Sequence, residues 1–229
     1  MQENKILLSL TTTPKSDWRK KIADIDRLEL KEVSLFLTGI EKDEREKLYA
    51  LLEKTSLKSV PHIHLRNDMG RDEITYLLER YQTSLLNIHP VEKSKHLFDK
   101  EILEPFRNKI YVENGHVLAS DEELKYYAGV CLDFSHWEYF GKKIKSYDEE
   151  LRNLASHHKI GCCHISAFRK VAFFFDISFH YGRAQEDFDY IKKYQKYLPE
   201  IISLELENDF EEQIKFKKYL EKILNIKKD

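Results

Sequence analysis

Short apolar runs rich in Val, Ile, Leu and Phe alternate with charged segments along the whole chain. Eight such runs are typical of β-strands, and they lie at 5–10, 32–39, 59–65, 84–90, 109–115, 129–136, 159–166 and 201–208. Between them, segments such as DEREKLYALLEKT (43–55) place leucines on one helix face. We expect further helices over 71–82, 121–128, 142–157, 187–197 and 210–226, with a cap at Ser120–Asp121 for the second of these.

Strands that alternate with helices predict a parallel sheet joined by right-handed crossovers. A closed barrel and an open doubly wound sheet both satisfy this alternation. Two features favour the barrel: the runs number eight, and no glycine-rich phosphate loop follows the first of them. The chain also has no linker and no low-complexity segment. We therefore predict α/β class, with residues 1–229 forming a single (β/α)8 TIM-barrel domain.

Composition excludes some partners. The 229 residues are 41% hydrophobic and 34% charged, with a formal net charge of −2. The chain thus has no global basic field for nucleic acid or an anionic membrane, and no apolar run is long enough to span a bilayer. The first residues lack a signal-peptide pattern, and the three cysteines show no CxxC spacing. These features predict buried, reduced thiols in a cytoplasmic protein and leave the oligomeric state open.

Polar residues gather at the carboxyl ends of the predicted strands, which form the active-site face of such barrels. In chain order they are His62, His64, His89, Glu113, Asp133, His136, His164 and Glu205, with His180 in the link that follows the seventh strand. Because strand side chains alternate faces, Cys131 and Asp133 should point inward while Leu132 faces the helices. The same phase points four further pairs inward: Asn87/His89, Tyr111/Glu113, Cys162/His164 and Ser203/Glu205.

Three carboxylates in otherwise apolar strands would be destabilising without compensation. Arg66 is the nearest cation to these strand ends, so metal ligation is a simpler compensation than a set of buried salt bridges. Carboxylate oxygens and imidazole nitrogens suit Mn²⁺, Mg²⁺, Co²⁺, Fe²⁺ or Zn²⁺. The sequence shows no convergent thiolate set, which argues against a structural zinc site.

Four motifs resemble those of the xylose isomerase-like TIM-barrel superfamily, over essentially the whole chain: IYVENG (110–115), CLDFSHW (131–137), CCHIS (162–166) and SLELEND (203–209). That superfamily groups sugar (phosphate) isomerases and epimerases with endonuclease IV-type AP endonucleases. For the isomerase branch, the resemblance implies one divalent cation held by Glu113, Asp133, His164 and Glu205. Glu207 has the same phase as Glu205 and is a rival ligand.

The same resemblance implies roles in proton transfer. Glu113 and Glu205 would act as acid and base on the carbon next to a metal-polarised carbonyl, and His136 would contact the substrate. The predicted function is therefore a metal-dependent isomerase or epimerase of a small sugar or related hydroxycarbonyl compound. His64, His89, His180 and Arg183 are the candidate substrate-binding residues.

Two alternatives stay open. Endonuclease IV-like members bind three zinc ions with additional histidines, which His64, His89 and His180 resemble. That branch has an Asp two residues before its later histidine, where this chain has Ser178. The chain is thus either an isomerase or, alternatively, a metal-dependent phosphodiesterase with more than one ion. A non-catalytic metal-binding barrel is the remaining alternative.

The link at 167–200 is the longest between two predicted strands. A loop of this length in a compact domain is more often functional than idle, although an extra buried element is the competing interpretation. Its cations Arg169, Lys170 and Arg183 are candidates for binding an anionic substrate.

Overall fold

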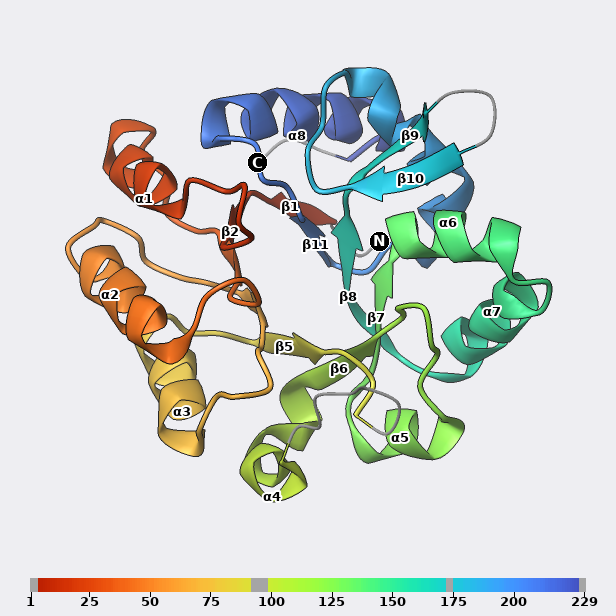
Figure 1. The fold of residues 1–229 in the computed structure, drawn as a ribbon, viewed down its shortest axis with the longest axis horizontal. Helices are drawn as coiled ribbons and strands as arrows, with labels where there is room; N and C mark the ends of the chain where they lie inside the picture. The colour runs from red at the N-terminus through yellow and green to blue at the C-terminus, as the bar shows by residue number, and fades with distance from the viewer. Residues whose placement is uncertain (1–3, 92–98, 172–174, 227–229) are drawn as a thin grey trace.

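The structure, a computed structural model, describes residues 4–91, 99–171 and 175–226. Nine parallel strands form one sheet in the order β1-β11-β8-β7-β6-β5-β4-β3-β2. At one edge β1 (Lys5–Leu7) pairs with β11 (Ile201–Leu204), and at the other β2 (Ser9–Thr11) pairs with β3 (Ser34–Phe36). Only Leu8 separates β1 from β2, so the two edges meet and the sheet forms a nearly closed barrel with helices outside it (Figure 1).

Each of the eight apolar runs contains a strand, and the first run supplies both β1 and β2. The other strands are β4 (His62–His64), β5 (Leu85–Ile88), β6 (Ile110–Glu113), β7 (Gly129–Asp133) and β8 (Ile160–Ile165). The α-helices are α1 (Trp18–Arg27), α2 (Lys42–Leu52), α3 (Arg71–Arg80), α4 (Lys100–Leu103), α5 (Asp121–Tyr126), α6 (Phe134–Lys143), α7 (Tyr147–His157) and α8 (Phe210–Leu224). The predicted α/β class and parallel sheet are confirmed.

The helix predicted over 142–157 is wrong at its start, because this stretch belongs to two helices, α6 and α7. Helix α6 begins directly after β7, since Asp133 is both the last strand residue and the N-cap: its Oδ1 accepts a hydrogen bond from the His136 backbone N–H at 2.7 Å. The segment expected over 187–197 is a 3₁₀ helix, η2 (Gln185–Tyr197), and a second one, η1 (Glu104–Lys109), precedes β6. Ser120 caps α5 as expected.

The long link after β8 holds an element of its own. Strands β9 (Ala167–Val171) and β10 (Phe175–Phe179) pair as an antiparallel two-stranded sheet, separate from the barrel sheet. This hairpin lies against α6 and η2 (Figure 1). The link therefore contains an extra element, as one of the two interpretations expected.

Alternation along the strands separates an outer core from the barrel interior. Leu132, Cys163 and Leu204 belong to the large core between sheet and helices, whereas Tyr111, Cys131 and Cys162 form a cluster apart from it. The interior also buries polar side chains, namely Ser9, Ser34, His62, Asn87 and Ser203, all fully inaccessible. Branched aliphatic residues normally fill this space, so the interior of this barrel is unusually polar.

Side-chain hydrogen bonds connect the first and last strands where the two edges of the sheet meet. Lys21 of α1 donates from Nζ to the Leu206 carbonyl (2.8 Å) and to Thr11 Oγ1 (3.0 Å). Gln213 of α8 accepts from the Ser9 N–H (2.8 Å) and donates to the Ser9 carbonyl (3.0 Å). These bonds satisfy backbone groups beside the break between β1 and β2. In the described part of the chain, no helix is long and apolar enough to cross a membrane.

Candidate metal centre

Four residues on neighbouring strands meet inside one mouth of the barrel. Glu113 ends β6, Asp133 ends β7, His164 lies in β8, and Glu205 directly follows β11. The strand register pairs Asp133 with His164. All four side chains are buried. Parallel strands bring their carboxyl ends to one face, which is why residues far apart in sequence come together here.

His164 directs one ring nitrogen at the carboxylates. Its Nδ1 lies 3.5 Å from Glu113 Oε2 and 3.6 Å from Glu205 Oε2, while its Nε2 lies 3.4 Å from Cys131 Sγ. Burial holds the pKa of His164 well below its usual value, so the ring is neutral. Within the described residues Nδ1 has no hydrogen-bond partner. A buried ring nitrogen that faces two carboxyl groups and has no hydrogen-bond partner is an arrangement that a cation can complete.

Asp133 also leaves one oxygen free. Its Oδ1 accepts hydrogen bonds from the His136 N–H and from Ser135 Oγ, both at 2.7 Å. Its Oδ2 is buried and, across the described ranges, has no hydrogen-bond partner. The cap therefore fixes the carboxylate while Oδ2 stays available. This orphaned oxygen and His164 Nδ1 fit the donor set of a divalent metal ion.

A second group shares Glu113. His64 Nδ1 donates to the Leu65 carbonyl (2.9 Å), which directs Nε2 at Glu113 Oε2, 3.0 Å away. Burial lowers the pKa of His64 to about 4, so two acceptors face each other unless a proton or a cation lies between them. His89 is exposed at the end of β5, and its ring completes a set with His64 and Glu113 whose ligand atoms lie within 4.8 Å of one another. Glu113, Asp133 and His164 meet the same criterion.

Burial also raises the pKa of both glutamates. For Glu113 the neighbouring His89 opposes this rise and the Asp133 charge adds to it, and for Glu205 the nearby His180 opposes it. Asn87 Nδ2 donates to Glu113 Oε2 at 2.8 Å. Without a cation the mouth therefore holds two carboxyl groups with raised pKa values, and a bound metal ion would oppose that rise.

Two further histidines border the carboxylates. His136 Nδ1 lies 3.7 Å from Asp133 Oδ2 and 3.8 Å from Glu113 Oε1. Burial lowers its pKa, but the negative charges of Asp133, Glu113 and Glu205 outweigh this and raise it. His180 Nδ1 lies 3.7 Å from Glu205 Oε1, whose charge raises the pKa of His180. Both rings are only partly buried, so they can act as cationic donors at the rim of the cluster.

The remaining candidate residues from the sequence are not part of this cluster. Glu207 accepts a hydrogen bond from Thr13 Oγ1 at 2.8 Å, so the structure brings Glu205 rather than Glu207 to the cluster. Arg183 is exposed, and its backbone N–H donates to Asp187. Arg169 donates from Nη2 to the Tyr181 carbonyl (3.0 Å). The side chains of Lys170 and Ser178 lie outside the described part of the hairpin.

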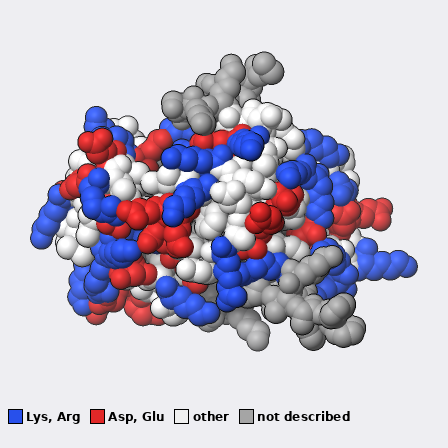
Figure 2. All heavy atoms as spheres, turned by 90° about the horizontal axis from the view of Figure 1, so that it is seen from above, with Lys and Arg blue, Asp and Glu red and all other residues white. Residues whose placement is uncertain are grey.

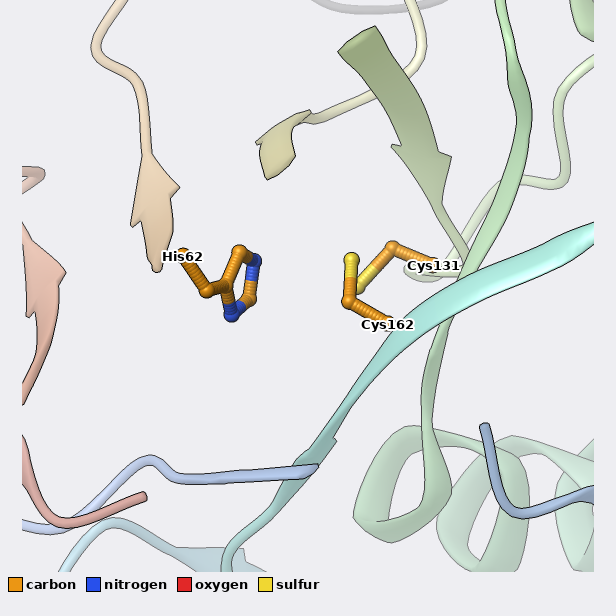
Figure 3. A group of neighbouring side chains, drawn as sticks. All are labelled: His62, Cys131 and Cys162. Atoms are coloured by element: carbon orange, nitrogen blue, oxygen red, sulfur yellow. The ribbon is translucent and has the colours of Figure 1, made fainter. Parts of the chain in front are cut away.

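The expectation that no thiolates converge is wrong. Cys131 and Cys162 face each other across β7 and β8, and with His62 of β4 they form a group whose ligand atoms lie within 4.8 Å (Figure 3). Sequence spacing within one segment, such as CxxC, could not reveal them. The signal was the inward phase of each cysteine, two residues before Asp133 and two before His164.

Fold and site together define an α/β barrel-like protein with a candidate metal centre of carboxylates and imidazoles. On the face drawn in Figure 2, basic and acidic side chains are intermingled without an extended patch of one sign. No protein-family model matches the chain, and a search of curated proteins finds no significant match.

Proposed function

We propose that the chain is a (β/α)8 barrel enzyme that binds a divalent metal ion and isomerises or epimerises a small sugar or related hydroxycarbonyl compound. The ligands are Glu113, Asp133, His164 and Glu205. The observation that carries the proposal is that Glu113 Oε2 and Glu205 Oε2 lie at nearly the same distance from His164 Nδ1, 3.5 and 3.6 Å. Counting β1 and β2 as one interrupted strand gives the eight strands of such a barrel. The motif resemblance to the xylose isomerase-like superfamily supports the same assignment.

A bound divalent ion supplies a Lewis acid that polarises a substrate carbonyl. We assign the proton transfer to Glu113 and Glu205. In this proposal one of them takes a proton from carbon and the other, at a similar distance from the His164 ring nitrogen, returns it. His136 and His180, with pKa values raised by the same carboxylates, donate hydrogen bonds to substrate oxygens.

Solvent exchange tests this proposal across a whole class of candidate substrates at once. The metal-loaded protein is incubated in D₂O with a panel of aldoses, ketoses and their phosphates, and deuterium incorporation at carbon is followed by NMR. We expect incorporation into one class of compound, and Glu205→Gln should slow it by about 10²- to 10⁴-fold. Glu207→Gln is the matched control, because Glu207 bonds to Thr13 instead. Equal exchange in Glu205→Gln and the native protein would remove the acid/base assignment.

One observation favours a second candidate, a metal-dependent phosphodiesterase. Glu113 belongs to two ligand groups, and a shared carboxylate is suited to a site with two ions that stabilise the attacking and leaving oxygens. Elemental analysis decides between the candidates. Two or three zinc ions per chain, reduced by His64→Ala or His89→Ala, together with cleavage of abasic DNA, would favour the hydrolase. An ion count that neither substitution lowers favours the isomerase. A stoichiometric ion with no activity on either panel would indicate a non-catalytic binding barrel.

A further inference from the structure

A second cluster lies directly beneath the carboxylates. Its members occupy the inward positions two residues earlier on the same strands: Cys131 before Asp133, Cys162 before His164 and, on β4, His62 before His64. All three side chains are fully inaccessible to solvent. Figure 3 shows them converging from three strands, with both sulfurs and a ring nitrogen directed at one another. Their ligand atoms lie within 4.8 Å of one another.

We propose that His62, Cys131 and Cys162 form a separate metal site for a thiophilic divalent ion, of the class of Zn²⁺, Co²⁺ or Cd²⁺. Sulfur and imidazole ligands select such ions, whereas the carboxylates above suit harder ones. The proposal does not depend on the isomerase assignment, because it uses a different ligand set.

Charge balance favours a divalent ion at this depth. Each thiol releases its proton on binding, and two thiolates neutralise the two positive charges. The filled site is then neutral, which avoids the large free-energy cost of leaving a net charge in the barrel interior. Binding of one ion therefore releases two protons per chain.

The hydrogen bonds of His62 are compatible with ligation. Its Nδ1 lies 2.7 Å from Ser203 Oγ, and its Nε2 lies 2.9 Å from Asn87 Oδ1. Since Asn87 donates its Nδ2 protons to Glu113, its oxygen is an acceptor and Nε2 carries the proton in the metal-free protein. On binding, that proton moves to Nδ1, where Ser203 Oγ accepts it, and the ion takes the Nε2 lone pair. Ser203 then orients the ligating ring, as outer partners of metal-bound histidines commonly do.

The two clusters touch through one imidazole. His164 Nε2 lies 3.4 Å from Cys131 Sγ, while its Nδ1 faces Glu113 and Glu205. The same ring therefore borders both sites, and filling the lower one changes the electrostatic field at the upper one. The test must for this reason read the sulfur ligands directly rather than the activity.

Cobalt titration of the full-length, metal-free protein under a phosphine reductant provides that reading. The ion is added both to the native protein and during refolding, because the ligands are buried. We expect a near-ultraviolet thiolate-to-cobalt charge-transfer band that saturates at about one ion per chain, with release of about two protons. Cys131→Ala and Cys162→Ala should lose the band.

Two controls should keep it. Cys163→Ala removes an equally buried thiol that belongs to the outer core. Asp133→Asn removes a ligand of the upper cluster only. The cadmium NMR shift of the native protein separates sulfur from oxygen ligands without any substitution, which covers the case in which a variant fails to fold. Absence of the band and of a sulfur-type cadmium shift, or a band that persists in both Cys131→Ala and Cys162→Ala, would overturn the proposal.

Discussion

Buried charged side chains have different ion-pair partners at the α2–α3 contact and at the barrel mouth. Arg45 of α2 is fully inaccessible, yet it is completely paired. Its Nε donates to Glu73 Oε1 at 2.7 Å, its Nη2 to Glu73 Oε2 at 3.1 Å, and its Nη1 contacts Asp68 Oδ1 at 3.1 Å. Tyr49 adds a further hydrogen bond to Glu73 (2.8 Å). Every charge in this group has a partner of opposite sign.

At the mouth, Glu113, Asp133 and Glu205 are as deeply buried, but the ion-pair partners found for them within the described ranges are histidines. Burial lowers the pKa of His64 and His164, so these two rings supply no positive charge. His136 and His180, whose pKa values the carboxylates raise, supply it only at the partly exposed rim. An ion pair that serves only stability is expected to resemble the Arg45 group. Buried carboxylates whose partners are titratable histidines rather than an arginine are typical of a ligand site. This contrast is the structural reason for placing a cation at the mouth.

The largest effect on stability is expected at the paired site. Glu73→Gln leaves Arg45 buried with only Asp68, which is itself one-third exposed, as a charged partner. Removal of one member of a buried pair typically costs about 3–5 kcal/mol, so the free energy of unfolding in urea should fall by about 3 kcal/mol. Metal binding should be unchanged, because α2 and α3 supply none of the ligands. A loss below about 1 kcal/mol would mean that pairing does not distinguish the two regions.

The opposite result is expected from Asp133→Asn. Asparagine keeps the oxygen that caps α6 and replaces only the orphaned Oδ2, so the metal-free protein should keep its stability within about 1 kcal/mol. Affinity for the metal ion at the barrel mouth, measured by calorimetric titration, should fall by more than about 100-fold. Loss of a residue that only hydrogen-bonds to a metal ligand commonly costs about 10- to 100-fold, and Asp133 is itself a proposed ligand. A strongly destabilised variant with unaltered metal affinity would give this carboxylate a purely structural role.

The periodicity of the chain predicted the strands well because each apolar run reflects burial between two layers. It failed where capping outweighs periodicity: Asp133 ends β7 and caps α6, so residues 134–136, expected in the strand, begin a helix. The helix expected over 142–157 therefore combines the end of α6 with α7. It also could not show that Leu8 interrupts the first strand, because that break depends on how the two sheet edges meet.

Alternation of side chains likewise predicted which residues point inward, including the four candidate ligands. Alternation within one strand could not predict the distances between side chains on different strands. Cys131 and Cys162 are neighbours only through the register of β7 and β8, and Glu207 turns to Thr13 although it shares the phase of Glu205. Convergence from three or more strands is a property of barrel curvature, which no local pattern contains.

Lys21 is a third kind of buried charge, because its hydrogen-bond acceptors are neutral oxygens rather than carboxylates. It is buried and bonded to three oxygen acceptors, the third being the Ser9 carbonyl at 3.4 Å. Burial lowers its pKa to about 7, opposed by the charges of Glu207 and Asp209. Between pH 7 and the unfolded value of 10.5 the unfolded chain binds more protons than the folded chain, so the stability contribution of Lys21 rises with pH.

From pH 7.5 to pH 9 the free energy of unfolding of the native protein should therefore rise by about 2 kcal/mol relative to Lys21→Met. Lys20→Met is the matched control, because Lys20 is half exposed on the same helix and pairs with Asp209 at 2.9 Å. That variant should keep the native pH slope. If Lys21→Met and the native protein instead show the same slope, the three acceptors hold the ammonium charged without a carboxylate. Neutral oxygens could then stabilise buried charge as fully as Glu73 does for Arg45, and missing countercharge would no longer distinguish a ligand site.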